Sequence, residues 1–128
     1  MQVVITGGAG FLGRRLVTQL LERGTLGSPA GKATPIKALV VFDAVAPAPP
    51  LPVDSRLEVV TGDITDRALL AQVIDANTAS VFHFAAVVSA AAEADFDLGM
   101  RVNLSGTMAV LDACRALPQA PRLVFTSS

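Results

Sequence analysis

Five short runs of apolar and β-branched residues divide the chain, and each predicts a buried strand. The runs cover residues 2–6, 36–42, 57–60, 80–84 and 123–126. Apolar residues at helical spacing predict three helices between these strands, over residues 12–23, 67–76 and about 98–117. Gly24 and Pro118 end the first and last helices, and Thr65 or Asp66 caps the second.

The segments between these elements predict irregular structure. Residues 25–35 hold glycine, serine, proline and lysine, so we expect an exposed loop there. Residues 44–54 contain four prolines, which exclude regular structure. Residues 85–94 are mostly small and lead into the last helix.

Strands that alternate with helices are typical of an α/β protein whose parallel sheet is built from right-handed crossover units. We therefore predict a single domain over residues 1–128, with a Rossmann-type, three-layer α/β/α fold. The predicted strand order, counted along the chain, is 3-2-1-4-5. In such a sheet a ligand binds at the switch point between the first and fourth strands.

The composition narrows the class of protein. Of 128 residues, 52% are hydrophobic and 16% are charged, with a net charge of −1. No basic run is present, so we expect neither a nucleic-acid partner nor an anionic membrane surface. The chain shows no stretch long enough to span a membrane and no secretory leader, which favours a cytoplasmic location. The single cysteine, Cys114, excludes an internal disulfide, and we expect no metal site.

A glycine-rich turn follows the first predicted strand. Gly7, Gly10 and Gly13 give it the spacing G-x-x-G-x-x-G. Gly7 permits a tight turn, Gly10 lets the backbone approach a pyrophosphate, and Gly13 lets the helix pack closely on the sheet. Gly8 is interpreted as a spacer. The alternative is a tight strand-to-helix turn that binds no ligand.

The residues around this turn offer partners for a dinucleotide. The amides of Phe11 and Leu12 open the first helix and can bond phosphates, aided by the helix dipole. Asp43 ends the second strand, where a carboxylate can accept hydrogen bonds from both adenosine ribose hydroxyls. It would repel a 2′-phosphate, which favours NAD over NADP. The alternative is an aspartate that only caps the proline-rich loop.

Two further segments follow the third and fourth strands. Asp63 can accept a hydrogen bond from an adenine amino group, with Ile64 packing on the ring. The alternative for Asp63 is a favourable charge at the start of the next helix. Ala85 and Ala86 leave room for a cofactor to cross the sheet edge, although small residues also suit simple core packing.

Three polar residues complete the set of candidates. His83 stands between two phenylalanines, and we interpret it as a buried, hydrogen-bonded core residue rather than a base. Asn103 is expected to bond backbone near the fourth and fifth strands, unless it is an uninvolved surface residue. Ser128, at the carboxyl end of the fifth strand, can bond a substrate hydroxyl or carbonyl; the alternative is a polar strand end.

Taken in order, these motifs resemble the extended short-chain dehydrogenase/reductases, the NAD-dependent epimerase/dehydratase group. The resemblance rests on residues 6–13, 43, 62–64, 83–86, 103–107 and 125–128. Residues 87–89 and 94–103 are more narrowly similar to the D-erythronate dehydrogenases, which oxidise a four-carbon sugar acid at C2.

The resemblance implies NAD as cofactor and a role for each motif. The three glycines match the pyrophosphate site, and the two aspartates match the ribose and adenine acceptors. Ile64 belongs to the adenine pair, and the two alanines match residues that line the cofactor. Asn103 matches a structural asparagine near the active site, and Ser128 matches the serine of a Ser-Tyr-Lys set.

One part of the family pattern is missing from these residues. In the family a Tyr-x-x-x-Lys motif follows the serine, with the tyrosine as general acid/base and the lysine lowering its pKa. This chain has no tyrosine. We interpret it as the N-terminal fragment of a longer enzyme, inactive alone. The family also dimerises through the helix that matches residues 98–117, so we expect an exposed apolar stripe there and a homo-oligomer.

The leading hypothesis is therefore NAD-dependent oxidation of a small sugar acid such as D-erythronate. A nucleotide-sugar epimerase or dehydratase would use the same cofactor half. A non-catalytic dinucleotide-binding module and a folding unit without a ligand are the remaining alternatives. The partner in the enzymatic cases is a small sugar acid or nucleotide sugar.

Overall fold

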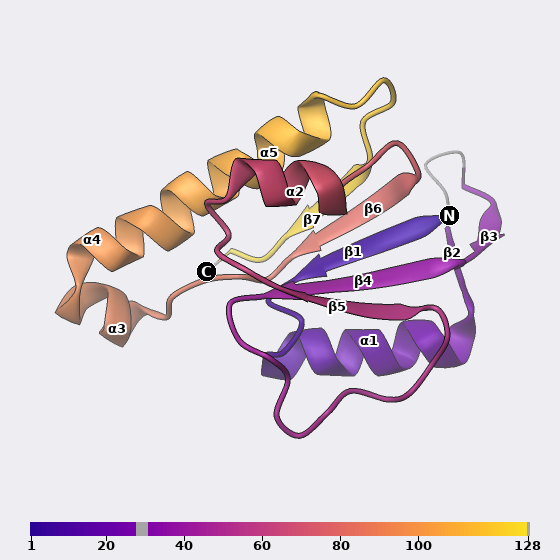
Figure 1. Ribbon diagram of the computed structural model, residues 1–128, viewed down its shortest axis with the longest axis horizontal. Coiled ribbons are helices and arrows are strands. Elements are labelled where there is room, and N and C mark those ends of the chain that lie inside the picture. Colours follow the sequence, from indigo (N-terminus) through magenta and orange to yellow (C-terminus); the bar gives the residue numbers. More distant parts are fainter. Residues whose placement is uncertain (28–30, 128) are drawn as a thin grey trace.

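A five-stranded parallel sheet forms the centre of the computed structural model, which describes residues 1–27 and 31–127 (Figure 1). The strands are β1 (Gln2–Thr6), β4 (Ala38–Asp43), β5 (Leu57–Thr61), β6 (Thr78–His83) and β7 (Arg122–Phe125). They lie in the order β5-β4-β1-β6-β7, and every neighbouring pair is parallel. This order confirms the predicted α/β class and the predicted 3-2-1-4-5 topology.

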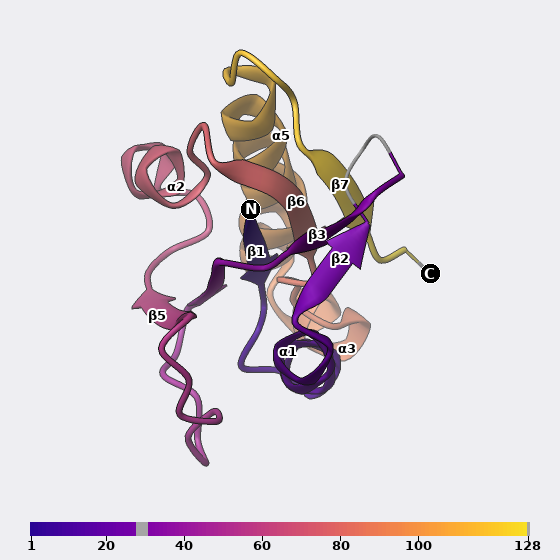
Figure 2. The same cartoon turned by 90° about the vertical axis from the view of Figure 1, so that its right-hand side faces the viewer.

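Helices cover both faces of the sheet, which gives the three layers seen end-on in Figure 2. The helix α1 (Phe11–Arg23) lies on one face, and α2 (Arg67–Val73) and α5 (Thr107–Arg115) lie on the other. Side chains alternate between the two faces along a strand, so Val3 and Ile5 pack with α1 while Val4 packs with α2 and α5. Strands buried on both faces carry nearly continuous apolar runs, which explains why these strands could be predicted from the sequence.

The segment predicted as one helix over residues 98–117 is more varied. It contains α4 (Phe96–Gly99), the π-helix η1 (Met100–Gly106) and α5. The preceding residues form another short helix, α3 (Ser89–Ala94), where only a small-residue connection was expected. Asp95 separates α3 from α4, and its carboxylate accepts a hydrogen bond from the amide of Leu98 at 2.9 Å.

The prediction of a loop over residues 25–35 is wrong for both ends of this segment. The two ends form strands, β2 (Thr25–Gly27) and β3 (Ala33–Pro35), which pair as an antiparallel hairpin. Leu26 packs against the core cluster beside α1, so tertiary packing supports strands that carry no sequence periodicity. Residues 44–54 are irregular, as the prolines predicted. Asp66 rather than Thr65 caps α2, accepting from the amide of Leu69 at 3.0 Å.

Glycines let α1 approach the sheet closely. A Cβ on Gly13 would lie 2.5 Å from both the carbonyl oxygen of Gly7 and the Cα of Gly8. Gly8 is more than the spacer we expected, because its own Cβ would lie 2.6 Å from a methyl group of Val41. Within the described ranges, none of the helices combines the length and apolar character that a bilayer crossing requires.

Substituting Gly13→Ala tests this close approach. The new methyl group meets backbone atoms that have no rotamer with which to yield, so we expect a loss of about 1–3 kcal/mol in the free energy of unfolding. The control is Gly27→Ala, where an added Cβ meets nothing within 4 Å. Urea unfolding curves measure both, and similar midpoints for the two variants would contradict the packing argument.

Candidate functional site

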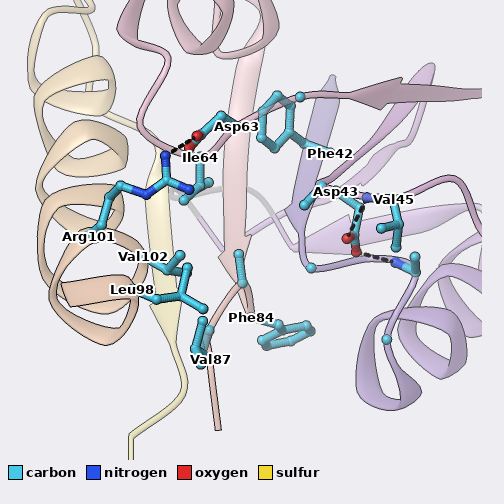
Figure 3. A pocket seen from close by; sticks show the side chains of 17 residues that line it. Phe42, Asp43, Val45, Asp63, Ile64, Phe84, Val87, Leu98, Arg101 and Val102 are labelled. Atoms are coloured by element: carbon cyan, nitrogen blue, oxygen red, sulfur yellow. Dashed lines mark hydrogen bonds and ion pairs between the residues drawn. The ribbon is translucent and has the colours of Figure 1, made fainter. Parts of the chain in front are cut away.

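A cavity of about 650 Å³ opens at the carboxyl ends of the central strands. Its walls come from the segments that follow β1, β4, β5 and β6, and from η1 (Figure 3). This position is the switch point predicted from the strand order. Seven predicted site residues line the cavity: Gly7, Gly10, Asp43, Asp63, Ile64, Ala85 and Ala86.

The glycine turn forms one wall of this cavity. Gly7 has a φ of 71°, and a Cβ there would lie 2.6 Å from the amide nitrogen of Ala85. Gly10 is the N-cap of α1 and carries no side chain that can satisfy the first amides of the helix. Phe11 and Leu12 supply these amides, while their side chains are exposed and do not line the cavity. The turn therefore presents the amide donors of the helix start next to two glycines that line the cavity and carry no Cβ.

Asp43 links the turn to the loop after β4. One carboxylate oxygen accepts a hydrogen bond from the amide of Ala9 at 2.8 Å, and the other accepts from the amide of Val45 at 3.4 Å (Figure 3). The structure is compatible with both interpretations of Asp43, as a ribose acceptor and as a cap of the proline-rich loop, because the residue borders the cavity and also bonds the loop backbone. Its partners are uncharged, so they leave the negative charge of the carboxylate facing the cavity.

Arg14 bonds the backbone of the glycine turn, a contact that the sequence analysis did not predict. Its Nε donates to the carbonyl of Ala9 at 3.1 Å, and an Nη donates to the carbonyl of Pro49. It therefore fastens the proline-rich loop to the glycine turn. No local pattern could have indicated this, because Pro49 lies far away in the chain.

Asp63 is held by donors on two sides. One oxygen accepts from the amide of Thr65 at 2.9 Å and from its hydroxyl at 2.8 Å. The other pairs with Arg101 of η1 at 2.8 Å (Figure 3). The hydrogen bonds from Thr65, with a further contribution from the charge of Arg101, lower the pKa of the Asp63 carboxyl from its usual value. The result is an ionised acceptor at one end of the cavity.

Arg101 was also missed, since nothing in the sequence marks an arginine on this helix as a pocket residue. Ile64 beside Asp63 is buried and packs against η1's last residue: a Cβ on Gly106 would lie 2.5 Å from an Ile64 methyl group. The helical segment therefore comes within contact of the Asp63–Ile64 pair at both Arg101 and Gly106.

Asn103 bonds backbone, as predicted. Its side-chain oxygen accepts from the amide of Val87 at 2.8 Å, and its Nδ2 donates to the carbonyl of Val87 at 2.9 Å. Asn103 borders a second cavity of about 430 Å³, which shares residues 85–87 with the first. Ser127 also lines this second cavity, while Ser128 lies outside the described residues.

His83 is the buried core residue that the sequence predicted. Only 1% of its surface is exposed, and its two ring nitrogens lie 2.6 Å from the Thr6 hydroxyl and 2.9 Å from the Thr107 hydroxyl. Burial lowers the pKa of its imidazole from the usual 6.5. In the part of the chain that the structure describes, no three acidic, histidine or cysteine side chains are grouped so that they could hold a metal ion.

Comparison with known proteins identifies the family. The model of the 3-beta hydroxysteroid dehydrogenase/isomerase family matches residues 4–128. The chain belongs to this family. The match confirms the resemblance to extended short-chain dehydrogenase/reductases that the motifs indicated.

Relatives and solved structures agree with that assignment. A D-erythronate dehydrogenase of Cupriavidus necator is 56% identical over all of this chain, which spans 39% of that protein's length. A nucleoside-diphosphate-sugar epimerase from Agrobacterium tumefaciens superposes with a TM-score of 0.84 at 36% identity, covering 100% of this chain and 37% of its own. A dTDP-glucose 4,6-dehydratase from Streptomyces venezuelae, solved with NAD, gives 0.78 at 30% identity, covering 96% and 38%.

The burial of His83 predicts a pH-dependent stability. Because its pKa is lower in the folded than in the unfolded chain, the unfolded state binds the proton more readily. The free energy of unfolding should therefore fall as the pH drops below about 6.5, and be fully regained above it. It is the chain's single histidine, and the Asp63 and Asp112 carboxyls, whose pKa values are lowered from 3.8, act only at lower pH. Urea midpoints at pH about 7.5 and 5.5 test this, and equal midpoints would contradict it.

Proposed function

We propose that this chain forms the NAD-binding part of an oxidoreductase that oxidises a small sugar acid such as D-erythronate. The observation that carries the proposal is the cavity at the sheet's switch point, with a glycine-capped helix start and a carboxylate on its walls. The 56% identity to a D-erythronate dehydrogenase supports the choice of a sugar acid. The presence of NAD in a related dehydratase supports the cofactor.

The residues present fit a dinucleotide. Gly10 and the first amides of α1, on Phe11 and Leu12, would hold the pyrophosphate, where a side chain would block its approach. Asp43 would accept from the adenosine ribose, and Asp63 from the adenine, whose ring would lie against Ile64. The Ala85–Ala86 pair would border the nicotinamide half. When bound, NAD supplies a hydride acceptor.

Oxidation itself is proposed for the whole protein. The 128 residues contain no tyrosine, so they lack the general acid/base that the resemblance implies, and we expect them to be inactive alone. Ser128 keeps its proposed role of orienting a substrate hydroxyl. We also propose a cytoplasmic, reducing setting, because the single cysteine cannot form an internal disulfide.

A nucleotide-sugar epimerase or dehydratase is the second candidate. It is favoured by the epimerase from A. tumefaciens, which superposes on all of this chain. The two candidates share the cofactor and differ in whether the hydride remains on NADH at the end of the reaction. If the whole protein accumulates NADH with a sugar acid, the dehydrogenase is supported. If it converts a nucleotide sugar without releasing NADH, the second candidate is supported.

Binding of NAD and NADP tests the cofactor assignment. We expect the chain to bind NAD at least tenfold more tightly, about 1.4 kcal/mol, because Asp43 repels a 2′-phosphate. Asp43→Asn keeps an oxygen for the Ala9 amide but removes the charge, and it should erase most of the preference. Glu22→Gln, at the far end of α1, removes the same charge as a control. Calorimetric titration measures all three proteins, and an absence of NAD binding to the unchanged chain would reject the proposal.

We further propose that the chain forms a homo-oligomer through its last helical region. An apolar stripe with side-chain exposures between 41% and 71% runs along it, as predicted: Phe96, Met100, Leu104, Met108 and Leu111. Such a stripe is costly to leave in water.

Light scattering at several protein concentrations tests the oligomer. The unchanged chain should exceed the mass of a monomer, and Leu104→Asp, in the middle of the stripe, should shift it toward the monomer. Val53→Asp places the same charge on another exposed apolar residue outside the stripe and should leave the mass unchanged. A monomeric unchanged chain at high concentration would count against self-association.

A further inference from the structure

A continuous series of hydrogen bonds runs through the buried ring of His83. The amide of Ala85 donates to the Thr6 hydroxyl at 3.4 Å, and this hydroxyl lies 2.6 Å from Nδ1 of His83. On the other side, Nε2 of His83 lies 2.9 Å from the Thr107 hydroxyl. The Thr107 hydroxyl donates to the backbone carbonyl of Asn103 at 2.7 Å. We call these five residues the His83 relay.

Simple proton counting gives the relay a single direction. A carbonyl only accepts, so the one hydroxyl proton of Thr107 is committed to Asn103. Thr107 must then accept from His83, which places the imidazole proton on Nε2. In the neutral ring Nδ1 is therefore an acceptor, and Thr6 donates to it while accepting from Ala85. Each hydroxyl both donates and accepts, so no proton of the relay lacks a partner.

The residues at the two ends of the relay both bond the backbone of residues 85–87 or belong to it. The relay starts at Ala85, and Asn103, at its other end, grips Val87 with two hydrogen bonds. Residues 85–87 line both cavities and connect them. His83 thus joins Thr6 of β1 to Thr107, the first residue of α5. Thr107 in turn bonds Asn103 of the π-helix η1. The Phe125 ring stacks on the imidazole, with 5.8 Å between the two ring centroids.

We propose that His83, as the neutral Nε2–H tautomer, is a positioning residue that fixes residues 85–87 and thereby the nicotinamide half of a bound dinucleotide. The cofactor part of this inference rests on the proposed function. The adenosine half would lie between Asp43 and Asp63. The other half must then extend past the glycine turn and across residues 85–87, where an error in backbone position misplaces the reacting ring.

The tautomer is directly measurable because the chain has one histidine. Labelling histidine with ¹⁵N gives a single pair of ring nitrogens in an NMR spectrum. At neutral pH we expect a protonated Nε2 and a bare Nδ1. A proton on Nδ1, or on both nitrogens, would overturn the relay as drawn.

Substitution of Thr107 separates positioning from general stability. Thr107→Val keeps the shape but removes the hydroxyl, which leaves the Nε2 proton without its acceptor. Thr107→Ser retains the hydroxyl and is the matched control. We expect the valine variant to bind NAD about tenfold more weakly, to bind AMP within about twofold of the unchanged chain, and the serine variant to recover NAD binding. Equal weakening for NAD and AMP would indicate a merely structural role, and no weakening would also overturn the proposal.

A second readout does not depend on the cofactor. Hydrogen exchange of the Val87 amide reports how firmly Asn103 holds the segment. It should accelerate about tenfold in the valine variant relative to the serine variant, measured against the core amide of Val4 as reference. Unchanged exchange would refute the positioning of residues 85–87. An unchanged chain that fails to bind NAD would instead refute the proposed function and the cofactor part of the relay.

Discussion

The contact between the glycine turn and the end of β6 is the constraint on which the site depends. At Gly7 the backbone turns with a positive φ, and the chain passes so close to Ala85 that no side chain fits between them. This contact brings the start of α1 and the segment after β6 together at one edge of the sheet. A cavity forms there because the chain after β1 leads to α1 on one face of the sheet, while the chain after β6 leads to the helices on the other face.

The two aspartates of the cavity, Asp43 and Asp63, have different hydrogen-bond and ion-pair partners, and these partners give them different binding properties. Asp43 is bonded by backbone amides alone, so it offers negative charge to whatever approaches. Asp63 shares its charge with Arg101 and is oriented by Thr65, so it is a fixed acceptor rather than a source of repulsion. The first arrangement suits the exclusion of an extra phosphate, and the second suits recognition of one donor at a set position.

The parts of the structure that sequence reasoning could predict are those governed by short-range rules. The central strands could be predicted because they are buried on both faces, which favours consecutive apolar residues such as Val3, Val4 and Ile5. The G-x-x-G-x-x-G turn was visible because its spacing follows from a single strand-to-helix connection. The contacts of Arg14 with Pro49 and of Arg101 with Asp63 join distant segments, and no periodicity encodes them. The β2–β3 hairpin was not predicted because its pairing depends on the packing of Leu26 against the core. The hydrogen bonds around His83 could not be predicted because they join three elements that are distant in the sequence.

The widened turn of η1 has a consequence for how this helical region tolerates change. The hydrogen bonds of a π-helix span one more residue than those of an α-helix, so η1 is wound less tightly than the α-helical segments next to it. In this region Asn103 bonds the backbone of Val87, while Leu104 and Met108 are exposed. We expect the deletion of one residue here to rotate the side chains before and after that point by about 100° relative to one another. The hydrogen bonds of Asn103 to Val87 and the exposed positions of the apolar side chains therefore depend on the same helical register.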